Sequence, residues 1–244
     1  MPNYELRDSD AALAKQARLY LEQIIAIDSA SDERSESTPS TQGQIELADF
    51  LSSVFRDLGA TIARTESGCL IASLPGQGAG IGAAPIALMI HLDTAEGTRA
   101  IDQLEARANW DGSPLSWPKN EHLEVSLDLY PSLSGFIGHT ILHGHGDAPI
   151  GLDDKLGLAH MMSLAWLLAH EEGADYPPLL LVGRPDEEIG RDEDIADLAR
   201  ELARRGVTRG YTIDGIAPFE VNLENFNASG ASLHFPSVAV PDES

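Results

Sequence analysis

The sequence predicts an α/β fold with a mixed, largely parallel central sheet flanked by helices. Short, uniformly apolar runs of the kind that fill the buried centre of a sheet recur along the chain: CLIASL, PIALMI, TIL, PLLLV and YTI. Stretches with helical spacing separate some of these runs, and such alternation of strands and helices is typical of α/β domains.

Four stretches carry the helical pattern: residues 9–27, 44–59, 155–172 and 193–205. The clearest is 44–59, where Gly59 is placed to end the helix. The polar segment between the first two stretches predicts a flexible loop. Residues 97–138 hold two tryptophans, several prolines and little periodicity, which predicts a long structured excursion from the sheet and not a second domain.

Composition limits the possible partners. The 244 residues include 16 basic and 39 acidic side chains, a formal net charge of −23, which argues against nucleic acid and anionic membranes as partners. There is no apolar run near 18 residues and no basic-then-apolar start. The single cysteine, Cys69, cannot form an internal disulfide, and its apolar surroundings predict a small buried hydrophobe. These features predict a cytoplasmic protein.

Four acidic or histidine motifs each follow an apolar run or its turn: HLDT, LDDK, PDEEIG and IDG. Sites in open α/β sheets form beyond the carboxyl ends of the strands, so the four motifs predict one cleft. Without cations to compensate it, the negative charge gathered there would be prohibitive, and carboxylates with one imidazole favour Zn, Mn or Co. The residues concerned are His91, Asp93, Asp153, Asp154, Asp186, Glu187, Glu188 and Asp214.

Each motif also has an ordinary structural interpretation. An aspartate of the 153–154 pair could cap a helix, the other acidic motifs could be solvated turns or strand ends, and the HxD motif could be structural. His91 and Asp93 are two residues apart in an extended segment, so Asp93 could accept the second ring N–H of a metal-bound His91. Of the adjacent Glu187 and Glu188, one could bind metal while the other acts as a base. The four motifs together, in this order, are much more specific than any one alone.

The stretches HLDTAEG, GLDDKLGLAHMM, PDEEIGRD, GYTIDG and LENFNAS resemble the dinuclear zinc exopeptidase family, and the last two resemble its peptidase T-like aminopeptidases in particular. The resemblance runs from about residue 10 to residue 230. It implies a two-metal hydrolase that removes the N-terminal residue of short peptides such as tripeptides, with zinc bound and with manganese or cobalt as possible substitutes. Two metals about 3.5–4 Å apart generate a nucleophile at neutral pH and polarise the scissile carbonyl.

The resemblance also implies a role for individual residues. His91 and Asp214 would bind one metal, Glu188 would bind the second, and Asp153 would bridge the two. Asp93 would orient His91, and Glu187 would be the general base that deprotonates the water between the metals. The Asp153–Asp154 peptide bond is expected to be cis.

The chain also departs from the family pattern. Family members continue after the ENFNA stretch into a lid and dimerisation domain and then supply a late histidine to the second metal. We therefore expect residues 1–225 to be the N-terminal part of the catalytic domain, incomplete at its C-terminus, and residues 226–244 to be the start of the otherwise missing domain. The second metal site is expected to be weakened. His143 and His145, on a Gly-rich loop, could replace the late histidine or be exposed loop residues.

Two alternatives to an active aminopeptidase follow from these departures. The chain could be a truncated, catalytically incompetent metal-binding fragment, or a related aminoacylase or carboxypeptidase that shares nearly all of these residues.

Overall fold

The structure, a computed structural model, describes residues 8–117, 120–171, 173–191, 193–215 and 221–224, together with residues 231, 233 and 235. A five-stranded sheet forms its centre, in the order β1-β2-β8-β3-β9. The strands are β1 (Thr61–Arg64), β2 (Leu70–Leu74), β3 (Ile86–His91), β8 (Leu179–Arg184) and β9 (Arg209–Thr212). Strands β8, β3 and β9 run parallel, whereas β2 is antiparallel to both β1 and β8, so the predicted mixed sheet is confirmed.

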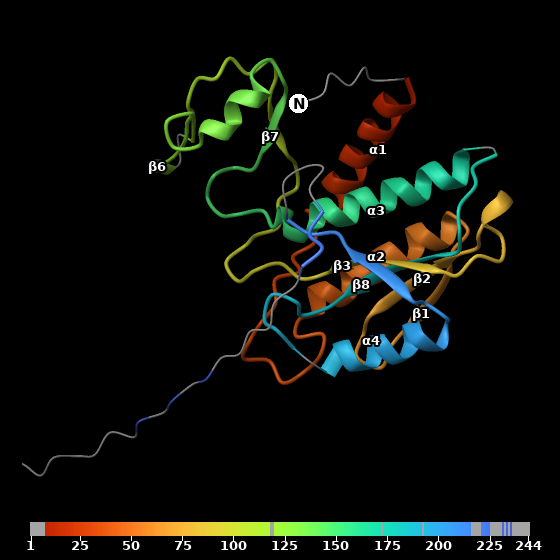
Figure 1. Cartoon of the computed structure of the whole chain (residues 1–244). Helices are drawn as coiled ribbons and strands as arrows, with labels where there is room; N and C mark the ends of the chain where they lie inside the picture. The colour runs from red at the N-terminus through yellow and green to blue at the C-terminus, as the bar shows by residue number, and fades with distance from the viewer. Residues whose placement is uncertain are drawn as a thin grey trace, which may run out of the picture.

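Helices cover both faces of this sheet (Figure 1). On one face lie α1 (Asp8–Ile24), α2 (Gln42–Asp57) and α3 (Leu152–His170), and on the other lies α4 (Glu193–Arg204). Alternate residues of the strands supply the two cores, because successive side chains of a strand point to opposite faces. In β8, for example, Leu181 packs with α1–α3, whereas Leu180 and Val182 pack with Leu198 of α4.

All four helices predicted from periodicity are present, with ends within a few residues of the expected positions. The prediction for Cys69 is also confirmed: it is fully buried on the α4 side of the sheet, and burial raises the pKa of its thiol to about 11. Among the described helices, none combines the length and the apolar character needed to cross a membrane.

The excursion predicted over residues 97–138 is present and extends to residue 143. It holds two small two-stranded sheets, which Figure 1 places beside the α1–α3 end of the molecule. One sheet pairs β4 (Glu105–Arg107) with β7 (Ile141–His143), and the other pairs β5 (Leu115–Trp117) with β6 (Asn120–Val125). Short 3₁₀ turns lie at Gly78–Gly80 and Pro131–Phe136.

Two apolar runs do not lie in the buried centre of the sheet as predicted. The TIL run forms β7, which pairs with β4 outside the central sheet. The YTI run contributes to β9, which pairs with β3 along one edge and exposes all four of its residues, Tyr211 by 53%. A uniformly apolar run predicts a strand, but how many neighbours that strand has depends on segments distant in sequence. Residues 226–244 lie almost entirely outside the described residues, so the predicted domain boundary stays a prediction.

Candidate metal centre

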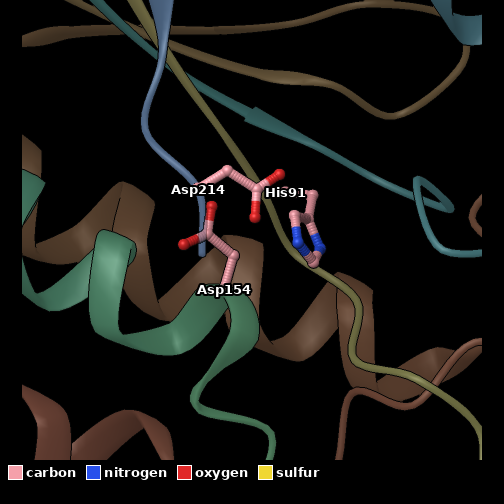
Figure 2. Close-up of side chains that lie close together, drawn as sticks. All are labelled: His91, Asp154 and Asp214. Atoms are coloured by element: carbon pink, nitrogen blue, oxygen red, sulfur yellow. The ribbon is translucent and has the colours of Figure 1, made fainter. Parts of the chain in front are cut away.

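The predicted motif residues gather at one edge of the central sheet. His91 ends β3, residues 186–188 follow β8, and Asp214 follows β9, so the carboxyl ends of three parallel strands deliver them to the same place. The first turn of α3 brings Asp153 and Asp154 to this edge, where Figure 2 shows Asp154 beside His91 and Asp214.

The two ring nitrogens of His91 face different partners. Nε2 lies 2.9 Å from Oδ1 of Asp153, while Nδ1 lies 2.9 Å from the backbone oxygen of Asp93 and 3.4 Å from its carboxylate. Asp93 is therefore placed to fix the ring, as a residue that orients a metal-bound histidine must be. Burial lowers the pKa of His91, but the hydrogen bond and charge of Asp93, together with Asp154 and Asp153, outweigh it and raise that pKa to about 10.

Asp93 also connects β3 to the acidic turn after β8. Its fully buried carboxylate accepts the backbone N–H groups of Glu187 at 3.0 Å and of Glu188 at 3.1 Å. One carboxylate thus contacts both the histidine and the turn that carries the two glutamates.

Two groups of side chains at this edge have the composition of a metal site. His91, Asp153 and Glu188 form one group, and His91, Asp154 and Asp214 form the other; within each, one potential ligand atom per residue lies within 4.8 Å of the others. The four predicted metal ligands all belong to these groups. The structure adds Asp154 to them (Figure 2).

Asp154 is a buried carboxylate with one unpartnered oxygen. It is 3% exposed, and its Oδ2 has no hydrogen-bond partner among the described residues. Burial, only partly offset by the charge of His91, raises its pKa to about 8, and Asp214 and Asp153 add to the rise. An orphaned buried oxygen and several carboxylates around one imidazole fit a divalent cation such as zinc.

The pair at the start of α3 makes no side-chain capping hydrogen bond. The Asp153–Asp154 peptide bond is cis, as the resemblance implied. Both residues have non-helical backbone angles, and no side chain caps this helix end.

Asp186 departs from the expected cluster. Its carboxylate points away from both groups and accepts hydrogen bonds from Ser40 and Gln44, so it is not positioned to bind metal. The two candidate replacements for the late histidine are also elsewhere. His143 packs edge-on against Trp117, with 5.4 Å between ring centroids, and with His145 it lines a separate cavity of about 420 Å³.

Two buried polar residues around the centre, Ser40 and Gln44, were not identified from the sequence, and the structure adds a buried contact for Lys155 of the LDDK motif. The Nζ of Lys155 donates to the backbone oxygen of Ile27 at 2.6 Å, and burial lowers its pKa to about 8. The partners of all three residues are distant in sequence, and no short motif marks Ser40 or Gln44.

The fold of this chain matches that of known exopeptidase structures. Aminopeptidase PepT from Bacillus cereus superposes with a TM-score of 0.52 at 18% identity, covering 83% of this chain and 44% of that one. Human carnosine dipeptidase 1 gives a TM-score of 0.54 at 15% identity, covering 85% and 40%. The chain therefore shares the mixed-sheet fold of these two proteins, and it covers less than half of each.

By sequence, the chain is similar to peptidase T. It is 36% identical over 211 residues to peptidase T of Desulfitobacterium hafniense, and 35% identical over 214 residues to that of an Exiguobacterium species. These matches cover 85% and 86% of the chain, which spans about half the length of the curated relatives it matches. No family model matches the chain. The resemblance to peptidase T indicated by the motifs is thereby confirmed.

Proposed function

We propose that this chain carries the metal centre of a metal-dependent exopeptidase of the peptidase T type. The observation that carries the proposal is the pair of ligand groups that share His91 at the carboxyl ends of three parallel strands. The relationship to peptidase T supports the reaction class, and the names of those relatives support a peptide substrate.

The geometry supports a division of the ligands between two cations. His91 and Asp214, with Asp154 beside them, would hold one, and Glu188 would hold the other. Asp153 suits the bridging position. It contacts His91 and belongs to the same ligand group as Glu188. It is also close to the segment that carries Asp214, because a Cβ added to the neighbouring Gly215 would lie 3.3 Å from Asp153 Oδ2. Zinc is the proposed metal, with manganese or cobalt as substitutes.

Bound zinc would supply a polarised water and would draw electron density from the scissile carbonyl. The protein residues would then orient the reactants and move the proton. Glu187, half-buried next to Glu188, would accept the proton of the attacking water and deliver it to the leaving amine. Asp93 would keep the His91 ring oriented and hold the Glu187–Glu188 turn through its two backbone hydrogen bonds.

The expected substrate is a short peptide, cleaved after its N-terminal residue. The test is hydrolysis of a tripeptide with added zinc, manganese or cobalt, against a chelator-treated control. We expect metal-dependent release of the N-terminal residue, and we expect Glu187→Gln to abolish turnover while metal stays bound.

Three outcomes of this assay would contradict the proposal. Release of the C-terminal residue would favour a carboxypeptidase, and cleavage of an N-acetylated amino acid alone would favour an aminoacylase. Tight binding of about one zinc without turnover would favour the incompetent metal-binding fragment, because a complete dinuclear site binds about two. The cytoplasmic location and the dimerisation through a further domain stay predictions.

A further inference from the structure

A network of buried polar groups lies directly behind the acidic turn of the metal centre. At its middle is the carboxylate of Asp186, which is fully buried. Its Oδ2 accepts the backbone N–H of Ser40 at 2.8 Å, and its Oδ1 accepts the Ser40 hydroxyl at 2.5 Å and the Gln44 side-chain amide at 2.7 Å. A buried carboxylate is thus satisfied by three donors, none of which is a charged side chain.

Gln44 contacts Asp186 through both ends of its amide group. While Nε2 donates to the Asp186 carboxylate, Oε1 accepts the Asp186 backbone N–H at 3.1 Å. The amide therefore fixes the main chain and the side chain of Asp186 at once.

The direction of the Ser40 hydroxyl bond follows from the other bonds of its oxygen. Ser40 Oγ accepts from the backbone N–H of Asp32 at 3.0 Å and from Gln44 Nε2 at 3.1 Å. Because a hydroxyl has two acceptor positions and one proton, that proton is left to point at Asp186. Ser40 therefore contributes both its backbone N–H and its hydroxyl to the Asp186 carboxylate.

Asp186 sits at the bend of the turn that carries the two catalytic-site glutamates. Its φ angle of 55° lies in the left-handed region, where aspartate is tolerated better than most residues. The next two residues, Glu187 and Glu188, give their backbone N–H groups to Asp93. The turn is thus held on one side by Asp93 of the β3 end and on the other by Ser40 and Gln44.

The second side of this support is rigid because of where it is anchored. Gln44 belongs to α2, and Ser40 lies two residues before the start of this helix at Gln42. The α2 helix is fixed in the core by fully buried Leu47, Leu51 and Phe55. The turn is therefore held to a well-packed helix by side-chain hydrogen bonds.

We propose that Ser40 and Gln44 are positioning residues that act through Asp186 to hold Glu187 and Glu188 at the metal centre. The inference rests on the proposed function, since it takes Glu188 as a metal ligand and Glu187 as the base. Partners that orient metal ligands typically change metal affinity 10–100-fold when they are removed.

The test compares Ser40→Ala with a matched control, Ser163→Ala. Ser163 is also a buried serine, and its hydroxyl donates to the backbone oxygen of Ala159 at 2.6 Å within α3. Two quantities are measured on each variant: the amide hydrogen exchange of Glu187 and Glu188 in metal-free protein, and zinc affinity by competition with a chromogenic chelator.

We expect Ser40→Ala to accelerate exchange at these two amides and to weaken zinc binding at least tenfold, and Ser163→Ala to change neither. Ser40→Thr, which restores the hydroxyl donor, should recover both values. If Ser40→Ala does not fold, Gln44→Met removes both contacts of the amide at nearly constant volume and carries the same expectation.

The proposal is overturned if the Ser40 or Gln44 variant matches Ser163→Ala in both measurements. Failure of the proposed function has a different signature. In that case wild-type protein binds no zinc, and the exchange comparison, made without metal, still decides whether Ser40 holds the turn.

Discussion

Zinc binding to this protein should tighten steeply as pH rises, because the proposed shared ligand His91 must first lose a proton. The ring is 4% exposed, and Asp93, Asp154 and Asp153 outweigh the effect of burial and raise its pKa to about 10. A metal can bind only the neutral imidazole. At pH 7, about 3 units below this pKa, the metal must displace the proton from His91. The displacement costs about 4 kcal/mol of apparent binding free energy.

The sign and size of the pH effect follow from this displacement. Each unit of pH should tighten zinc binding about tenfold while His91 is still protonated, or about 30-fold between pH 7.5 and 9. Asp154 has a pKa raised to about 8, so below pH 8 it carries a proton that the metal must also displace. This second proton steepens the pH dependence. A histidine with an ordinary pKa near 6.5 would be neutral across this range and would give a nearly flat dependence.

The assay is zinc titration against a chelator whose own pH dependence is known. Calorimetry in two buffers of different ionisation enthalpy counts the protons released, and at least one per His91 site is expected at pH 7.5. Asp93→Asn removes the group that most raises the pKa of His91, so it should flatten the dependence. Zinc affinity that is constant from pH 7.5 to 9, with no proton release, would refute the reasoning.

Three further predictions concern the core and the centre. Burial raises the pKa of the Cys69 thiol from 9.0 to about 11, so as pH rises the unfolded chain loses this proton before the folded protein does. The free energy of unfolding should therefore fall by about 3 kcal/mol between pH 9 and 11. Urea unfolding of Cys69→Ala should lack this component of the pH dependence. Arg184→Met should cost about 3 kcal/mol in urea unfolding, since Arg184 Nε lies 2.5 Å from fully buried Asp194, and a loss under 1 kcal/mol would contradict this. Gly157→Ala would place a Cβ 2.2 Å from Oδ1 of Asp154 and displace that carboxylate, so zinc affinity should drop at least tenfold. If the added Cβ met no steric conflict, alanine would instead stabilise the helix by about 1 kcal/mol and leave zinc binding unchanged.

The helices and the buried strands could be predicted because their signals are local. An amphipathic repeat such as that of 44–59 reports which face is buried whatever the partner is. The number of strands beside a given strand is not a local property. The strand at Thr61–Arg64 was missed because its four residues carry no uniform apolar run, and β9 was expected inside the sheet although it forms an exposed edge.

The residues of the candidate metal centre also differ in how far local sequence could predict them. His91, Asp153, Glu188 and Asp214 each lie next to an apolar run or a helix start, so strand-end logic and the family resemblance both indicated them. Ser40 and Gln44 contact Asp186 across 146 and 142 residues of sequence, and the loop that holds Ser40 is rich in serine and acidic residues. Its polarity predicted a flexible loop, whereas Ser40 itself is only 8% exposed.

The aspartate pair at the start of α3 shows why a local interpretation fails at such a centre. Local rules favour a cap, because aspartate suits the first turn of a helix. In the structure neither side chain caps the helix: Asp153 is directed at His91, and Asp154 is buried with one oxygen unpartnered. Two adjacent carboxylates, one of them buried without a full set of donors, would destabilise a helix end that served structure alone. A divalent cation would satisfy both carboxylates, so the position of the pair supports the proposed metal centre. Asp154→Asn should therefore weaken zinc binding while stability without metal is maintained or improved.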